Sequence, residues 1–197
     1  MGKRLIRRLF WSLGALALMM ITAHSVTAAT ATGTPDTYKI TFEVRFRKQG
    51  EAAYPSAANV VGTDVDVTGV SPGGTTATMT ATVDVGNYDK VQVIMNCTVK
   101  LKGSVSYSGS TYVTTAAGGV STSGSAAEGS YSLPSAFCSG GTTVTIESPT
   151  FSPPFTVGGT VTITFNAAGA LSLDFTGAPP SGPVLSPGAF SASMTTS

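Results

Sequence analysis

Hydrophobic and polar residues alternate along most of the chain after residue 30. In residues 38–47 apolar side chains take every second position, and hydroxyl or charged side chains fill the positions between them. Alternation with a period of two predicts a β-strand that buries one face and exposes the other. Residues 76–85 and 91–102 repeat this period, with a turn predicted at Gly86-Asn87-Tyr88-Asp89 between them. The predicted inward positions of the third run are Val91, Val93, Met95, Cys97, Val99 and Leu101.

Shorter runs of the same kind predict two hairpins and three further strands. The first hairpin turns at Ser108-Gly109-Ser110, and the second turns at Ala167-Ala168-Gly169 between residues 161–165 and 171–175. The three further strands span residues 61–67, 142–147 and 189–194. We expect the last of them either at the edge of a sheet or donated to a neighbouring molecule.

No stretch after the N-terminal leader has the spacing of an amphipathic helix. Many short strands separated by Gly, Pro and Asn predict one all-β domain over residues 29–197, an antiparallel β-sandwich of immunoglobulin-like or jelly-roll-like type. Residues 103–130 are rich in Gly and Ser, which is typical either of a mobile loop or of weakly registered strands. The prolines between residues 179 and 187 predict an extended connector.

Residues 1–28 have the pattern of a signal peptide. Four basic residues precede an apolar run at residues 9–21, and Val26-Thr27-Ala28 fits the small-x-small cleavage pattern, with Ala29 as the alternative site. An apolar run of 13 residues is shorter than the roughly 18–20 that span a bilayer, so cleavage is favoured over an uncut anchor. The pattern leaves the general and twin-arginine export routes open, since Arg7-Arg8 lies in the basic segment. We expect a bacterial protein that is secreted or held at the cell surface, with the periplasm as an alternative.

Removal of the leader changes the charge and the chemistry of the chain. Seven basic residues then face ten acidic ones, a net charge of −3, and the only His (His24) and Trp (Trp11) are lost. A negative chain lacks the electrostatic basis for binding nucleic acid or anionic membranes, and no stable membrane span remains. Without His, the Ser-His-Asp, Cys-His and His-metal sites are excluded. Paired carboxylates remain, but no sequence feature brings two of them into a cleft. We therefore expect no enzyme and no cofactor.

Cys97 and Cys138 are the only thiols, and export delivers them to an oxidising compartment. An even count in that compartment predicts a structural disulfide. The alternatives are a reactive thiol and a metal site, but a mature chain without His supplies neither an imidazole base nor a complete tetrahedral zinc site.

Two further pairs are candidate binding residues. Tyr107 and Tyr112 flank the first hairpin turn, where they could contact a ligand such as a glycan or pack across the strands. Asp64 and Asp66 share one face of a predicted strand and are a candidate calcium site, although Ca²⁺ takes six to eight oxygens. A solvated strand face explains the same two carboxylates without a metal. A basic cluster, Arg45, Arg47 and Lys48, is interpreted as the solvated edge of a sheet.

Two functions from different classes fit these observations. The first is a structural or surface-assembly role, as a pilin-like, coat or matrix subunit whose partners are itself or other surface subunits. The composition is similar to that of exported fimbrial subunits, but the cysteines lie mid-chain and no terminal aromatic motif follows, so no family is assigned. The second is a monomeric extracellular module that binds a glycan or a protein through loop tyrosines. The durable, weakly charged composition favours the first.

Overall fold

The structure, a computed structural model, describes residues 30–55, 59–68, 76–133, 138, 141–175, 183–188 and 191–196. The predicted signal peptide lies outside the described residues. Within them all regular secondary structure is β-strand, and every strand pair is antiparallel. The predicted all-β antiparallel class is therefore confirmed.

The largest unit, called here the large sheet, is built around two long strands, β2 (Thr37–Lys48) and β5 (Gly86–Asn96). β2 pairs with β5 and β6 (Thr98–Lys102) on one side and with β3 (Asn59–Asp66) on the other. Beyond β5 and β6 lies a third line of strands, formed by β10 (Gly129–Ser132), β11 (Thr143–Glu147) and β12 (Phe155–Val157). From Thr37 to Arg47, β2 alternates between half-buried and buried positions, as its sequence predicts.

Three smaller sheets complete the fold. The hydroxyl sheet has the order β16 (Ser191–Thr196), β13 (Thr160–Asn166), β4 (Thr76–Thr82). The end sheet has the order β1 (Thr30–Gly33), β14 (Leu171–Asp174), β15 (Val184–Pro187). The hairpin sheet has the order β7 (Ser104–Tyr107), β8 (Ser110–Thr114), β9 (Val120–Ser121).

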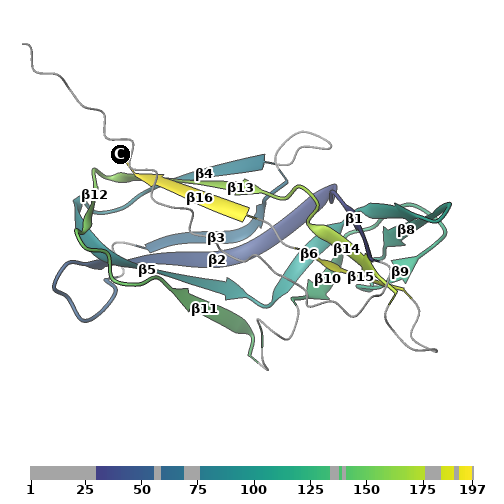
Figure 1. Cartoon of the computed structure of the whole chain (residues 1–197), viewed down its shortest axis with the longest axis horizontal. Coiled ribbons are helices and arrows are strands. Elements are labelled where there is room, and N and C mark those ends of the chain that lie inside the picture. The colour runs from purple at the N-terminus through teal and green to yellow at the C-terminus, as the bar shows by residue number, and fades with distance from the viewer. Residues whose placement is uncertain are drawn as a thin grey trace, which may run out of the picture.

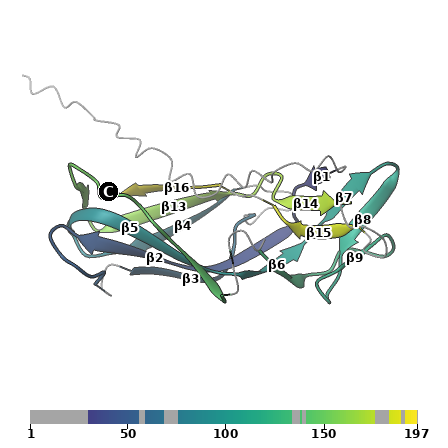
Figure 2. The same cartoon turned by 60° about the horizontal axis from the view of Figure 1, so that its bottom comes forward.

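The molecule is elongated, and the hydroxyl sheet lies over one end of the large sheet while the end sheet and hairpin sheet lie at the other (Figures 1 and 2). Between the large sheet and the hydroxyl sheet, the rings of Phe42 and Phe165 meet edge to face with centroids 5.4 Å apart. A single cluster of buried apolar side chains includes residues from all four sheets. Burial of each large apolar side chain contributes roughly 1.5–3 kcal/mol, so this shared core holds the sheets together.

Part of the Gly/Ser-rich segment 103–130 forms strands, as in the second of the two predicted alternatives, but these strands pair without a register shift and are therefore not weakly registered. The segment contains β7, β8 and β9 and leads into β10. The predicted turn is confirmed: Ser108 and Gly109 both have positive φ, 49° and 80°, and Tyr107 pairs with Ser110. Two consecutive positive φ values are typical of the hairpin turn whose twist matches its strands.

Two details of the predicted strands around residue 86 are wrong. The expected turn at residues 86–89 is the beginning of β5, and Tyr88 is fully buried. The reason is packing, because the Tyr88 ring packs against both Phe46 and Phe155, at centroid distances of 5.8 and 6.0 Å. The predicted strand extended to Val85, but β4 ends at Thr82 and Val85 is 71% exposed.

The second predicted hairpin does not form. β13 and β14 belong to different sheets, where β13 pairs with β4 and β16, and β14 pairs with β1 and β15. The connecting turn, closed by the Ala170 N–H donating to the Ala167 carbonyl at 3.0 Å, passes the chain from one sheet to the next. Ala167, Ala170 and Leu171 are all fully buried, so the chain continues along the core instead of folding back. The proline segment likewise differs from a plain connector, because its last residues form β15.

Candidate functional site

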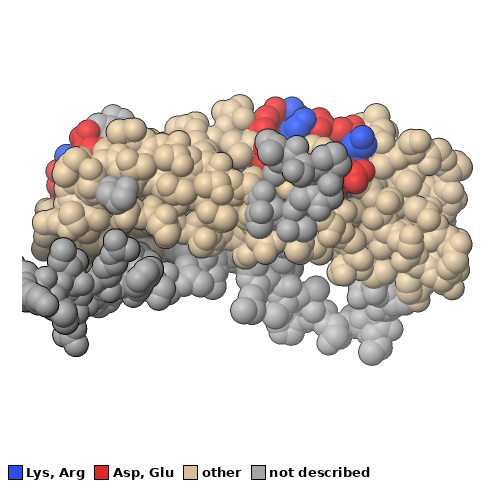
Figure 3. All heavy atoms as spheres, turned by 90° about the horizontal axis from the view of Figure 1, so that it is seen from above, with Lys and Arg blue, Asp and Glu red and all other residues tan. Residues whose placement is uncertain are grey.

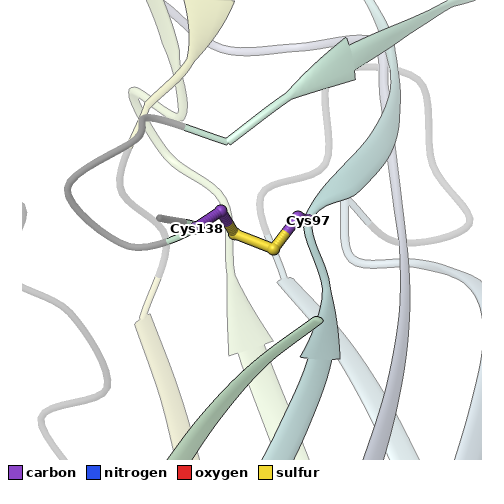
Figure 4. The surroundings of a disulfide bond; sticks show 2 residues. All are labelled: Cys97 and Cys138. Carbon is purple, nitrogen blue, oxygen red and sulfur yellow. A yellow bond between two sulfur atoms is a disulfide. The ribbon is translucent and has the colours of Figure 1, made fainter. Parts of the chain in front are cut away.

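The disulfide lies where two lines of strands are interrupted. Cys97 separates β5 from β6 and Cys138 lies between β10 and β11, with Cα atoms 5.8 Å apart (Figure 4). The Cys97 N–H donates to the Thr142 carbonyl at 2.9 Å, and its carbonyl accepts from the Leu133 N–H at 2.8 Å. Leu133 and Thr142 are thus both hydrogen-bonded to Cys97, and the bridge attaches Cys138, which lies between them in the sequence, to the same residue. The predicted disulfide is confirmed.

The two candidate calcium ligands have separate partners. Asp64 has a φ of 49° and lies where the pairing of β3 with β2 shifts register, and its carboxylate pairs with Lys100. The Oδ1 atom of Asp66 accepts hydrogen bonds from Thr68 Oγ1 (2.6 Å), Thr68 N (3.0 Å) and Tyr38 N (3.3 Å). These bonds make Asp66 a cap for the end of β3. Among the described residues no group of three or more His, Cys, Asp or Glu could hold a metal ion, so calcium binding by this pair stays a prediction.

The two candidate tyrosines pack on a third aromatic residue. Tyr107 and Tyr112 lie on the hairpin sheet, and both rings contact Phe175, which follows β14, at centroid distances of 4.7 and 5.4 Å. All three side chains are half-buried. Phe175 was expected only as a strand residue of the second hairpin, so its place between the tyrosines comes from the tertiary structure. This aromatic trio joins the hairpin sheet to the end sheet, and each of its residues is partly accessible to solvent.

Charged residues of the large sheet form ion pairs, some between strands, one within β2 and some with residues that flank the strands. Arg47 Nε of β2 donates to Asp89 Oδ1 of β5 at 2.8 Å, and further pairs are Lys39–Glu128, Arg45–Glu43, Lys48–Asp84 and Lys90–Glu147. In Figure 3 blue and red side chains lie next to one another, and most of the visible described surface is uncharged. The interpretation as a sheet edge is wrong for Arg45, which pairs with β3 on one side and β5 on the other. Arg47 and Lys48 lie beyond the last residue pair of β2 with β3, and among the described residues they pair with β5 alone. Each cation of the cluster contacts a carboxylate.

These pairs shift the acidity of their members. The hydrogen bond from Arg47 lowers the pKa of Asp89 below its ordinary value, and the same bond raises the pKa of Arg47. The hydrogen bond from Lys90 lowers the pKa of Glu147. Burial raises the pKa of Tyr54 to about 12, so this phenol stays neutral in the physiological range. The ion pairs favour the ionised form of both carboxylates, whereas a general acid or base needs a pKa moved toward neutrality.

The hydroxyl sheet contains no charged residue in any of its three strands. Its outward positions are almost all Thr or Ser in register across the strands, and Thr78–Thr164 and Thr80–Thr162 bring their hydroxyl oxygens to 3.5 and 3.4 Å. Its inward positions pack on the large sheet. An apolar cavity of about 30 Å³ lies between β2 and β5 on one side and β13 and β16 on the other, with Ala192, Ser193 and Met194 along its margin.

β16 is the final strand and lies at an edge of this sheet. Its only strand partner within the described residues is β13, through six pairs without a register shift. The sequence predicted a strand over residues 189–194, at an edge or donated to a neighbour. The structure places Ser191–Thr196 at the edge of its own sheet, which confirms the first alternative, while residues 189 and 190 lie outside the described part.

No protein-family model, no curated protein and no solved structure matches the chain. Within the described ranges, no helix is long and apolar enough to cross a membrane.

Proposed function

We propose that this protein is an exported, non-enzymatic structural subunit that assembles at the cell surface, and that residues 29–197 form one sandwich domain of immunoglobulin-like or jelly-roll-like type. The observation that carries the proposal is the hydroxyl sheet, an uncharged array of Thr and Ser side chains that ends in the uncharged edge strand β16. Natural monomeric proteins usually place charged residues, bulges or prolines at such an edge, because an unprotected edge pairs with other chains.

Three other observations support this role. The disulfide is typical of proteins that work in oxidising compartments, which fits secretion or the cell surface. The facing sheets share one buried core, which fits a single rigid unit. The cations of the large sheet named above all contact carboxylates, so they offer no unpaired basic patch for nucleic acid.

Light scattering after gel filtration tests the proposal on mature protein released gently from its native cells. We expect a species several times heavier than the mature chain, and electron microscopy of that fraction should then show fibres or a layer. A monomer at every concentration tested would contradict the assembly role.

The second candidate function is a monomeric binding module, and the aromatic trio is the observation that favours it. Exposed aromatic faces are suited to stacking on the apolar faces of sugars, and Tyr107 and Tyr112 lie on one face of the hairpin sheet. A glycan-retention screen comparing Tyr107→Ala and Tyr112→Ala with the native chain tests it. Retention lost in both variants, with unchanged thermal midpoints, would support binding. If the native chain retains no glycan and both variants have lowered thermal midpoints, the trio has a packing role instead.

A further inference from the structure

We infer that β16 of one molecule pairs antiparallel with β16 of a second copy, about a two-fold axis at Ser193. The pairing would join two hydroxyl sheets into one six-stranded sheet. This inference rests on the proposed assembly role and names its first contact. An antiparallel pair of identical strands is an isologous interface. If one residue of the first copy faces a second residue of the other copy, the second residue of the first copy faces the first residue of the other.

Other edges of the described sheets are protected, which singles out β16. β3 carries a register shift and two acidic residues, Asp64 and Asp66, and β11 ends in Glu147. β4 is uncharged but lies beside β3, β1 lies beside β7, and the four-residue edge strand β10 lies beside β15. β15 ends in Pro187, and β9 and β12 are only two and three residues long.

β16 has none of these devices. Its sequence, Ser-Ala-Ser-Met-Thr-Thr, has no charge and no proline, and its pairing with β13 is regular. At the end of the strand, Thr196 Oγ1 donates to the Thr156 carbonyl of β12 at 3.3 Å, so the free edge runs from Ser191 to Thr195. Alternate residues of this edge direct their N–H and C=O groups away from β13, and among the described residues no other strand pairs with them. Such groups permit strand addition, in which main-chain hydrogen bonds provide the affinity.

The sequence of β16 fits itself in one register. Inward residues must face inward residues, because a shift of one position would turn every side chain to the wrong face. The register centred on Ser193 pairs all five free residues, with Ala192 opposite Met194 and Ser191 opposite Thr195. It places the large Met194 beside the small Ala192 of the other copy, next to the apolar cavity that Ala192 and Met194 border. Alternation of large and small residues at such a position fills the space without strain.

A cysteine at the axis tests this register. Ser193→Cys places two thiols directly opposite each other, where Cβ atoms of paired residues are about 4.5–5.5 Å apart, close to disulfide distance. The native cysteines are bridged to each other, so the new thiol is the one that reacts. Thr80→Cys is the matched control, since Thr80 is an exposed residue in the middle of β4, the opposite edge of the same sheet.

We expect mild oxidation of the mature full-length Ser193→Cys protein to convert most of it into a covalent dimer, and Thr80→Cys to stay mostly monomeric. Ser193→Lys should reduce the assembled fraction in light scattering at least several-fold, because two like charges would face each other at the axis, whereas Thr80→Lys should leave it unchanged. Thermal melts of all four variants show whether each is folded.

Two results overturn the inference and separate it from the proposed function. If the native protein assembles but Ser193→Cys does not cross-link and folded Ser193→Lys assembles normally, the contact lies elsewhere and the assembly role stands. If the native protein is monomeric at every concentration, both the β16 contact and the assembly role are wrong.

Discussion

Thr114 Oγ1 donates a hydrogen bond to the Ala127 carbonyl at 2.7 Å, and the Ala127 N–H returns one to the Thr114 carbonyl at 2.9 Å. The same hydroxyl accepts from the Gly103 N–H at 3.0 Å, and the Thr114 side chain is fully buried. One threonine thus connects the beginning, middle and end of the Gly/Ser-rich segment. Thr114 thereby provides hydrogen-bond partners for buried backbone groups that would otherwise lack them. This explains how a stretch with few apolar side chains forms strands.

Replacement of Thr114 by valine should therefore destabilise the protein. Thr114→Val keeps the shape but leaves the Gly103 N–H without its side-chain acceptor, and an unsatisfied buried donor costs about 1–3 kcal/mol. Urea unfolding followed by circular dichroism measures the change in the free energy of unfolding. Thr111→Val is the control, since Thr111 is exposed on the same strand, and it should stay within about 0.5 kcal/mol of the native protein. Equal effects in the two variants would contradict the role given to Thr114.

Gly129 should tolerate no side chain. A Cβ atom at this position would lie 2.2 Å from the Thr115 carbonyl oxygen, and backbone at that distance cannot move aside cheaply. We expect Gly129→Ala to lower the thermal midpoint by several degrees or to prevent folding, since strain and overpacking of this kind cost about 1–3 kcal/mol. Gly119→Ala is the comparison, because its nearest contact would be Thr115 Oγ1 at 3.4 Å, and it should melt close to the native protein.

Loss of the disulfide should cost much of the stability. The bridge closes a 41-residue separation, for which the chain-entropy model gives roughly 4 kcal/mol. The double variant Cys97→Ala with Cys138→Ala should unfold at a correspondingly lower urea concentration. Reduction of the native protein with dithiothreitol should lower the urea midpoint by a similar amount. The double variant is the control: if dithiothreitol leaves its midpoint unchanged, the effect on the native protein comes from the disulfide. An unchanged midpoint after verified reduction would refute the prediction.

The Arg47–Asp89 pair should make stability depend on acidic pH. Because its bond with Arg47 lowers the folded-state pKa of Asp89, the unfolded chain takes up a proton first as the pH falls. The stabilisation is complete above the unfolded pKa of about 3.9 and is lost as the pH falls through the folded pKa. Asp89→Asn should be less stable than the native protein at pH 7, and the difference should shrink below pH 4. Urea midpoints measured from pH 7 to pH 2.5 check this, and a constant difference over that range would show that the ionised carboxylate is not responsible.

The candidate residues show how far sequence patterns reach. Cys97 and Cys138 could be paired from the sequence, because with two thiols in an oxidising compartment only one intramolecular bridge is available. The position of Asp64 could not be predicted, because the register shift that puts it in a positive-φ conformation depends on the pairing of β3 with β2. The contact of Phe175 with Tyr107 and Tyr112 could not be predicted either, because it depends on how the end sheet packs against the hairpin sheet.

The sequence by itself determined the strands and their buried faces, since side chains alternate with a period of two whatever the strand pairs with. The buried positions of β2 from Tyr38 to Phe46, and those from Val91 to Leu101 across the interruption at Cys97, follow this rule residue by residue. Only the tertiary structure decided which strands are neighbours. The alternation in β13 and β14 is the same in a hairpin as in two separate sheets, and the sequence of β2 does not show that Arg45 has a strand on each side. Pairing and edges depend on contacts between residues far apart in the chain, and a local period carries no information about them.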